Sequence, residues 1–314
     1  MMTVRASRTA SIRWTALLLG SLLALSGCSS ATSPGEYSTT TRTVTVGGLE
    51  RSFVLSAPTT VTSGAGLPLL IMLHGAGGDA AGFASLTGMT SVAEQSHFVV
   101  VYANGTQAAD VPGELSWNSG VCCGAPSRAG IDDVAFIDRL ITEVEATLQI
   151  DPARVFVAGF SNGGMLSYRL ACELGDRGAG SARIAGIADV AGAFNLPQCA
   201  DARPTAVLVL HGTADTVVPF DGGPTSPGVA ARFGTWLNAS VADSTAAWAG
   251  TNQCQSEPAV EITGAIETSS FVGCVAGAPL KLVTIADGSH SWPTRSNGGI
   301  PASELIVEFF GLDQ

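Results

Sequence analysis

The chain has 314 residues, of which 46% are hydrophobic and 13% are charged. This composition excludes a disordered chain, and the length allows one large buried core or two modest ones. The formal net charge of −11 gives an acidic surface that repels phosphate backbones, which excludes nucleic-acid binding as the main role.

The first 27 residues have the pattern of an export signal. Basic residues precede an apolar run over residues 14–25, which is too short for a membrane helix because such a helix takes about 20 residues. The run leads into Leu-Ser-Gly-Cys at residues 25–28, which resembles the lipobox of bacterial lipoproteins. We therefore predict a lipoprotein signal peptide over residues 1–27, a lipid on Cys28 and an exported protein that contacts the membrane only through that lipid. An ordinary signal peptide with an incidental cysteine is the alternative.

Residues 28–42 are rich in Ser and Thr and contain almost nothing to bury. This composition predicts a flexible tether between the lipid and a folded domain. The folded domain is predicted over residues 43–314, where neither a second linker nor an internal repeat interrupts the pattern.

From residue 43 onward, apolar runs alternate with helical patterns. A hairpin is predicted over residues 43–55, with Gly47-Gly48 at its turn. Strand-like runs follow at residues 67–73, 98–102, 154–158, 184–190, 206–210 and 281–286. Helical spacing of apolar residues over 134–148 and a closing pattern at 301–310 indicate helices. We therefore predict an α/β fold with a mostly parallel central sheet, an N-terminal antiparallel hairpin and helices on both faces.

The segment Gly159-Phe160-Ser161-Asn162-Gly163 has the pattern G-x-S-x-G. A buried-type strand runs into it and a helical pattern runs out, which is the strand–turn–helix context of a nucleophile elbow. Glycines are needed there because a Cβ would collide with neighbouring backbone. The pattern predicts Ser161 as a nucleophile at the mouth of the sheet; a glycine-rich turn without a catalytic role is the alternative.

A serine hydroxyl needs a base, and the chain has four histidines. His290 lies in a loop after the last predicted strand, and the chain order serine, acid, histidine also favours it as the base. A loop histidine with only structural hydrogen bonds is the alternative. His74 and His211 each close a strand and suit structural hydrogen bonds, whereas His97 suits the surface or packing.

Asp215 is the predicted acid, because it follows the strand at 206–210 and could fix the imidazole tautomer. Asp189, inside an apolar strand, and Asp221, further along the loop, are weaker candidates, and a turn-capping role for Asp215 is the alternative. The oxyanion hole is predicted to use the backbone N–H groups of Asn162 and Ala76, with Gly75 as the alternative to Ala76.

Setting Cys28 aside leaves an even number of cysteines: Cys122, Cys123, Cys172, Cys199, Cys254 and Cys274. In an exported protein this number favours up to three disulfides, with some buried free thiols as the alternative. Because adjacent cysteines rarely bond each other, we expect Cys122 and Cys123 to reach different partners, which leaves Cys254 and Cys274 as a local pair. The chain has no CxxC motif, so zinc ligation is not expected.

Six segments, in this order, resemble one known group of proteins. They are LIMLHGAGG at 70–78, SWNSGVCCG at 116–124, IDDVAFIDRLI at 131–141, DPARVFVAGFSNGGM at 151–165, HGTADTVVPF at 211–220 and GSHSWP at 288–293. The chain resembles the exported poly(3-hydroxybutyrate) depolymerase and feruloyl esterase group of α/β-hydrolases, including LpqC-type lipoproteins. The resemblance implies carboxylic-ester hydrolysis by Ser161, Asp215 and His290, without a metal or organic cofactor. It also implies Ala76 as an oxyanion donor, at a position where family members often carry a cysteine.

The sequence does not identify the substrate. Hydroxybutyrate oligoesters, hydroxycinnamoyl esters and acetylated xylan all fit one triad, and Trp117, Phe160 and Trp292 are candidate walls for the acyl or aryl group, with simple packing as the alternative. No polymer-binding module is expected after the domain, which disfavours crystalline polyester. An acyltransferase on the same fold and a non-catalytic surface binding lipoprotein are the alternative functions.

Overall fold

The computed structural model describes residues 36–60, 66–108, 113–174, 184–196, 199, 202–255, 257–275 and 277–314. The signal peptide predicted over residues 1–27 and the lipidated Cys28 lie outside the described residues. None of the described helices combines the length and the apolar character needed to cross a bilayer.

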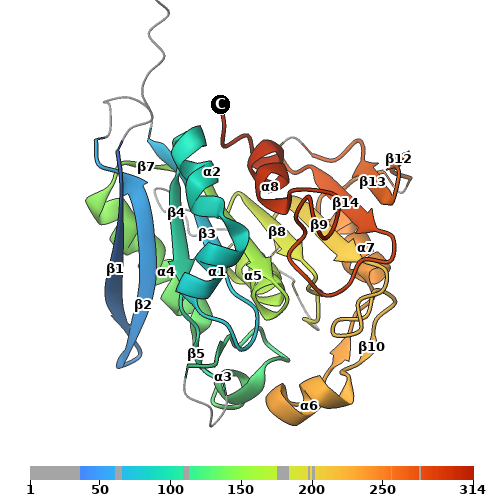
Figure 1. The fold of residues 1–314 in the computed structure, drawn as a ribbon, viewed down its shortest axis with the longest axis horizontal. Helices are drawn as coiled ribbons and strands as arrows, with labels where there is room; N and C mark the ends of the chain where they lie inside the picture. The colour runs from blue at the N-terminus through green and yellow to red at the C-terminus, as the bar shows by residue number, and fades with distance from the viewer. Residues whose placement is uncertain are drawn as a thin grey trace, which may run out of the picture. The chain divides into compact units, whose positions relative to one another are not determined.

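A ten-stranded sheet organises the described part of the chain, in the order β1-β2-β4-β3-β7-β8-β9-β14-β13-β12 (Figure 1). Its central strands, from β4 to β14 in this order, run parallel, and antiparallel hairpins extend both edges. The strands are β1 (Tyr37–Val46), β2 (Leu49–Pro58), β3 (Leu67–Leu73), β4 (Val99–Ala103), β7 (Ile150–Phe160), β8 (Gly186–Val190), β9 (Ala206–Gly212), β12 (Ala259–Thr263), β13 (Ile266–Phe271) and β14 (Leu280–Ile285). The predicted α/β architecture is confirmed.

Helices cover both faces of this sheet (Figure 1). One face packs against α1 (Ala80–Thr87), α2 (Met89–Ser96) and α8 (Ala302–Phe310), and the other against α4 (Asp133–Thr147), α5 (Asn162–Glu173) and α7 (Val241–Thr251). Residues of β3 alternate between the two cores, with Leu69 and Ile71 in one and Leu70 and Met72 in the other. Because both faces are buried, the central strands are continuously apolar rather than alternating.

Short elements lie at the end of the sheet where the parallel strands finish (Figure 1). The elements β5 (Thr106–Gln107), β6 (Leu115–Ser116) and α3 (Gly124–Arg128) follow β4 in the chain. The elements β10 (Gly223–Pro224), α6 (Pro227–Phe233) and β11 (Leu237–Asn238) follow β9, and α6 contacts α3. The carboxyl ends of parallel strands are where α/β proteins assemble ligand sites.

The first strand corrects the predicted start of the folded domain. Residues 37–42, expected to belong to the tether, form the first part of β1, which pairs with β2 from Tyr37 opposite Pro58. The Tyr37 hydroxyl donates to the carbonyls of Ala93 (2.8 Å) and Phe98 (3.1 Å), which fastens the start of the strand to α2. The segment is polar because β1 is an edge strand, and its threonines are good strand formers that need no burial.

A second hairpin, formed by β12 and β13, was not predicted. It extends the far edge of the sheet, where Val260 and Ile262 are exposed. The apolar residues of β12 are exposed, whereas Ile266 and Phe271 of β13 pack partly against the two cores. The hairpin therefore has no continuous buried run that its sequence could signal.

Candidate active site

Three side chains from separate parts of the chain meet beyond the carboxyl ends of β7, β9 and β14. The Nε2 atom of His290 lies 3.0 Å from Ser161 Oγ, and its Nδ1 atom lies 2.7 Å from Asp215 Oδ2. Ser161 directly follows β7, Asp215 lies three residues after the end of β9, and His290 lies in the loop after β14. The three residues expected to form a triad are therefore brought together, each within hydrogen-bond distance of the next.

Ser161 occupies a sharp turn between β7 and α5. Its backbone φ is +55°, a conformation that side-chain-bearing residues rarely adopt. The turn needs the glycines on either side, since a Cβ on Gly159 would lie 2.2 Å from backbone atoms of Gly163 and a Cβ on Gly163 would lie 2.2 Å from the Leu73 carbonyl oxygen. This close packing of β7, α5 and β3 holds the serine in place and is the geometry of a nucleophile elbow.

Asp215 is buried and fully occupied as an acceptor. Its Oδ1 accepts the N–H groups of Val217 (2.8 Å) and Val218 (2.9 Å), while Oδ2 faces His290 and also lies 3.4 Å from His211 Nε2. Burial alone would raise the pKa of Asp215, but the hydrogen bonds from His211 and His290 hold that pKa below its ordinary value. The carboxylate is therefore ionised at neutral pH and can keep the His290 proton on Nδ1.

Two backbone N–H groups beside Ser161 have no acceptor among the described residues and can donate to a developing oxyanion. Asn162 is the first residue of α5, where an N–H group has no acceptor within the helix. The Ala76 N–H donates to no acceptor within the described residues, whereas the next two N–H groups bond to Leu115 O and Gly75 O. Ala76, Asn162 and Ser161 line one pocket, which is the placement expected for the predicted oxyanion donors.

His74 organises the loop that carries Ala76. Its Nε2 accepts the Gly105 N–H at 3.0 Å and its Nδ1 lies 2.8 Å from the Gly75 carbonyl oxygen, so the ring proton is on Nδ1. Burial lowers the pKa of His74 to about 4, which keeps the ring neutral. Both His74 and His211 are buried and hydrogen-bonded, as their sequence context predicts, whereas His97 is exposed at the end of α2.

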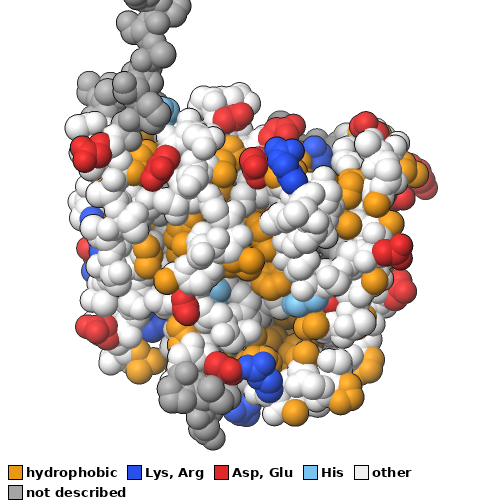
Figure 2. All heavy atoms as spheres, viewed as in Figure 1, with side chains coloured by type: hydrophobic (Ala, Val, Ile, Leu, Met, Phe, Trp, Pro, Cys, Tyr) orange, Lys and Arg blue, Asp and Glu red, His pale blue; other side chains and the backbone are white. Residues whose placement is uncertain are grey.

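A pocket of about 260 Å³ opens beside the serine. Its walls are mostly apolar and come from the elbow, from Cys123 and from the segment around α6, with lining residues that include Phe160, Met165, Val218, Val229, Phe233 and Trp236. Figure 2 shows hydrophobic side chains gathered in a hollow above α6, with a basic and an acidic side chain at its edge. Arg232 lines the pocket and pairs with Glu114. The pocket suits an apolar acyl or aryl group next to the nucleophile.

Only one of the three predicted aromatic walls lines this pocket. Phe160 does, and its ring also packs 4.9 Å from the His290 ring. Trp117 is fully buried and its Nε1 donates to the His74 carbonyl at 2.8 Å. Trp292 is 2% exposed and packs against Phe83. For these two tryptophans, the expectation of a pocket wall is wrong and the packing alternative holds, because their size makes them core residues first.

The walls from α6 and its flanks were missed. Phe233 and Trp236 belong to a segment without the periodicity of a long helix or a buried strand. Their apolar character is the only signal in the sequence, and it does not distinguish a pocket from a core.

Asp189, the weaker acid candidate, lies behind the elbow rather than at the triad. It is 1% exposed, and neither of its carboxylate oxygens has a hydrogen-bond partner within the described residues. A Cβ on Gly164 or Gly192 would lie 2.0 Å or 2.2 Å from Asp189 Oδ1, so this carboxyl explains the glycine at both positions. Burial raises the pKa of Asp189 from 3.8 to about 7 against the opposing effect of His211. Asp221, the other candidate, is exposed.

All six cysteines beyond Cys28 are bonded in pairs, but one pairing differs from the prediction. Cys254 bonds Cys274, as expected, and Cys172 bonds Cys199. Cys122 bonds Cys123, so the expectation that these neighbours reach different partners is wrong. The two side chains are buried, with 1% and 2% of their surfaces exposed, and they lie beside the pocket. No other cysteine of the described residues lines that pocket.

The parallel sheet, the elbow and the Ser161–His290–Asp215 arrangement define an α/β-hydrolase fold with a site of the serine-hydrolase type. Residues 61–239 match the phospholipase/carboxylesterase family, and the chain belongs to this family.

Similar proteins in other organisms are esterases by name. The chain is 30% identical over 291 residues to "Putative esterase NocK" of Nocardia uniformis subsp. tsuyamanensis, over 87% of this chain and 78% of the relative. It is also 30% identical over 248 residues to feruloyl esterase B of Piromyces equi, over 77% of this chain and 42% of the relative. The chain therefore spans less than half of the length of the Piromyces protein.

Solved structures share the fold at low sequence identity. The acetyl xylan esterase from Aspergillus awamori superposes with a TM-score of 0.57 at 16% identity, over 87% of this chain and 99% of that one. Esterase 2 of Thermogutta terrifontis, phosphorylated by paraoxon, superposes with a TM-score of 0.56 at 13% identity, over 86% of this chain and 92% of that one. At these identities the likeness concerns the fold alone.

Proposed function

We propose that the protein is a serine carboxylic-ester hydrolase that works through an acyl-enzyme on Ser161. One observation carries the proposal: the Ser161, His290 and Asp215 side chains form a chain of two hydrogen-bond distances, 3.0 Å and 2.7 Å, at the mouth of an apolar pocket. Membership of the phospholipase/carboxylesterase family supports the same reaction type.

In the first half of the reaction, Ser161 Oγ attacks the ester carbonyl carbon while His290 Nε2 takes the hydroxyl proton. The Nδ1–H group of the imidazolium that forms donates a hydrogen bond to Asp215, whose ionised carboxylate stabilises the positive charge. The carbonyl oxygen becomes an oxyanion and receives hydrogen bonds from the Ala76 and Asn162 N–H groups. Collapse of the intermediate breaks the acyl–oxygen bond, and His290 gives its proton to the leaving alcohol.

In the second half, water replaces the alcohol. His290 takes a proton from the water as it attacks the acyl carbon, the same two N–H groups stabilise the second oxyanion, and the free acid leaves as Ser161 regains its proton. The chemistry uses only the side chains and backbone groups already named, so the proposal includes no metal and no organic cofactor.

The proposed substrates are esters of apolar or aromatic acids, such as feruloyl or acetyl esters on polysaccharide or oligoesters of the polyhydroxybutyrate type. The pocket beside Ser161 supports an apolar acyl group, because Phe160, Phe233 and Trp236 line it. Arg232 at the pocket offers a cation to a polar substituent or a neighbouring ester oxygen. The name of the Piromyces relative, a feruloyl esterase, favours feruloyl esters among these.

The proposal also places the enzyme outside the cytosol, anchored by a lipid on Cys28. Disulfides persist in oxidising compartments, and the pairing of Cys172 with Cys199 and of Cys254 with Cys274 supports export. Labelling of the expressing bacterium with a radioactive or clickable fatty acid tests the lipid directly, with Cys28→Ala as the unlabelled control.

A substrate panel tests the activity. Methyl ferulate, a hydroxybutyrate trimer, acetylated xylan and p-nitrophenyl butyrate are each incubated with the wild type, with Ser161→Ala and with Ser91→Ala, an exposed serine of α2. We expect free acid from at least one ester with the wild type and the Ser91 variant, and a loss of about 10⁴-fold or more in Ser161→Ala. Transfer of the acyl group to an added alcohol in preference to water would favour an acyltransferase, and full activity in Ser161→Ala would contradict the proposal.

A further inference from the structure

We propose that the disulfide between Cys122 and Cys123 is a positioning element of the oxyanion hole. It contacts the side chain of Asn162, the residue whose N–H is one of the two oxyanion donors, because Cys122 Sγ lies 3.6 Å from Asn162 Nδ2. The inference rests on the proposed function, because it concerns how that reaction is stabilised.

The polar atoms of the Asn162 side chain contact the chain segment that ends in the disulfide. Its Oδ1 accepts the Trp117 N–H at 2.8 Å. Its Nδ2 lies 3.2 Å from the Trp117 carbonyl oxygen, 3.3 Å from Ser119 Oγ and 3.6 Å from Cys122 Sγ. Asn162 is 1% exposed, so these partners rather than water determine where its side chain, and hence the start of α5, is held.

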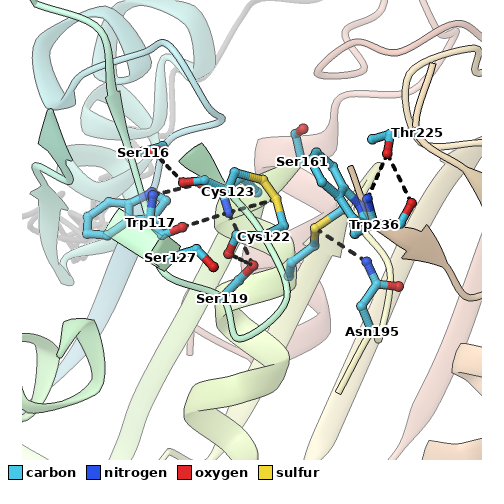
Figure 3. Close-up of a disulfide and its surroundings, with 12 residues drawn as sticks. Ser116, Trp117, Ser119, Cys122, Cys123, Ser127, Ser161, Asn195, Thr225 and Trp236 are labelled. Atoms are coloured by element: carbon cyan, nitrogen blue, oxygen red, sulfur yellow. Dashed lines mark hydrogen bonds between the residues drawn. A yellow bond between two sulfur atoms is a disulfide. The ribbon is translucent and has the colours of Figure 1, made fainter. Parts of the chain in front are cut away.

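The same segment is folded back on itself around the disulfide. The Ser119 N–H and hydroxyl both donate to the Cys122 carbonyl, at 2.6 Å and 2.8 Å. The Cys123 N–H donates to the Trp117 carbonyl at 3.0 Å, and the Ser116 hydroxyl donates to the Cys123 carbonyl at 2.9 Å. Figure 3 shows these bonds converging on the bonded pair. The covalent link removes side-chain rotation from both cysteines, so the acceptors that hold Asn162 have little freedom to shift.

Trp117 connects this segment to the second oxyanion donor. Its ring Nε1 donates to the His74 carbonyl at 2.8 Å, and its ring packs 4.9 Å from the His74 ring. Ala76 lies two residues after His74, in the loop that the His74 side chain organises. One segment of chain therefore contacts the supports of both N–H donors, and the Cys122–Cys123 bond lies at its end.

The disulfide also borders the pocket beside Ser161. Cys123 lines the pocket together with Ser161, Met165 and Trp236, and Figure 3 shows the bonded pair and Trp236 on opposite sides of Ser161. A bulky acyl group would contact this wall, whereas an acetyl group is too small to depend on it. The size of the acyl group thus separates positioning of the oxyanion donors from simple contact with the wall.

Reduction opens the bond without changing the sequence. A dithiol supplies two electrons and two protons, the S–S bond breaks to give two S–H groups, and the dithiol is oxidised to its own cyclic disulfide. The Cys122 sulfur can then rotate away from Asn162, and the segment that holds both donors loses its covalent restraint.

The test follows the hydrolysis of p-nitrophenyl acetate by the folded enzyme before and after reduction. Alkylation and peptide mapping verify that the Cys122–Cys123 bond is intact before treatment and open after it, and circular dichroism verifies the fold. We expect kcat to fall about 10- to 100-fold while KM changes less than about threefold, since a donor displaced by about 1 Å costs this much. A boronic acid that mimics the tetrahedral intermediate should weaken by a similar factor, and reoxidation should restore both.

Variants assign the effect to one disulfide. Cys254→Ala/Cys274→Ala and Cys172→Ala/Cys199→Ala remove the other two bonds, and each should keep the wild-type kcat until reductant is added. Cys122→Ala/Cys123→Ala should have the low kcat at once and should not respond to reductant. If this last variant does not fold, reduction of the folded wild type decides the question by itself.

Two results would overturn the proposal: an unchanged kcat for the acetyl ester when mapping shows the bond open, or free thiols at Cys122 and Cys123 in the untreated, active enzyme. Both leave the proposed function intact, because the untreated wild type would still hydrolyse esters. Failure of the proposed function is distinguishable, since the untreated enzyme would then hydrolyse no ester or would do so without Ser161.

Discussion

The Asp215 carboxylate is held in place by backbone hydrogen bonds from residues that follow it in the chain. The backbone N–H groups of Val217 and Val218 both donate to Oδ1, which fixes the carboxylate plane and leaves Oδ2 for His290. Its low pKa follows from hydrogen bonds and not from exposure, because burial acts in the opposite direction. The sequence alone could place an acid after β9, but these donors became visible only with the fold.

Replacing Asp215 with Asn keeps the shape of the side chain and removes its charge. The Asn oxygen can still accept from Val217 and Val218, so the melting temperature should change by only a few degrees, whereas kcat should fall about 10³- to 10⁴-fold because the imidazole tautomer is no longer fixed. Kinetics with p-nitrophenyl butyrate and a thermal melt provide both values. Asp221→Asn removes an exposed carboxylate from the same loop and serves as the control. A kcat for Asp215→Asn within tenfold of the control would show that Asp215 is not the acid of the triad.

Asp189 predicts a dependence of stability on pH. The folded state holds the pKa of this carboxyl at about 7, compared with 3.8 ordinarily. Below about pH 4 the carboxyl is protonated in both the folded and the unfolded state, so its titration does not change the free energy of unfolding. Between about pH 4 and about pH 7 the unfolded chain releases a proton that the folded chain retains. The free energy of unfolding therefore falls as pH rises through this range.

The variant Asp189→Asn lacks this titration. Its melting temperature, measured across the same range of pH, should therefore rise relative to that of the wild type as pH increases. Asp221→Asn, whose carboxyl is exposed, should follow the wild type at every pH. A difference between wild type and Asp189→Asn that stays constant with pH would contradict the raised pKa.

At the scale of elements, the turn from β7 into α5 could be predicted with its residues. Residues 159 and 163 must be glycine because neighbouring backbone atoms lie too close to leave room for a Cβ. The run of apolar residues before Ser161 follows from burial of β7 on both faces. Local backbone requirements and burial leave traces in neighbouring residues, so a short window of sequence contains them.

The segment from β10 to β11 has no such signal in its sequence, although it forms part of the pocket beside Ser161. Trp236 lines the pocket and its Nε1 donates to Asn238 Oδ1 at 2.7 Å. Removing its indole in Trp236→Ala enlarges the pocket, so kcat/KM for butyryl or aromatic acyl esters should fall about 10- to 100-fold and that for acetyl esters less than about threefold. Leu237→Ala, which truncates the adjacent, 71% exposed residue, should leave both unchanged. Equal losses for all acyl groups would mean that Trp236 supports the fold and not the acyl group.

At the scale of the whole molecule, the sheet order joins residues that are distant in the sequence. The predicted strands at 67–73 and 206–210 agree with β3 and β9 within a few residues. The pairing of Cys122 with Cys123 was not predictable in the same way, because the usual behaviour of adjacent cysteines favours separate partners. The start of β1 was missed because an edge strand can be polar, so its composition does not distinguish it from a tether.

The disulfide between Cys172 and Cys199 predicts a contribution to global stability. It joins α5 to a point 27 residues further along the chain, and closing a loop of this length stabilises a fold by about 3.5 kcal/mol. The variant Cys172→Ala/Cys199→Ala should therefore unfold at a lower denaturant concentration than the wild type, with kcat preserved in the absence of denaturant. An unchanged unfolding midpoint would show that this bond does not restrain the unfolded chain.

Labelling of the nucleophile shows whether Ser161 performs the ester hydrolysis. The enzyme is incubated with paraoxon, an organophosphate that phosphorylates activated serines, and its peptides are analysed by mass spectrometry while residual esterase activity is followed. We predict a diethylphosphoryl group on the peptide that contains Ser161, formed in step with the loss of activity and absent from Ser161→Ala. Undiminished ester hydrolysis by protein fully labelled at Ser161, or inactivation with the label on a different residue, would contradict the mechanism.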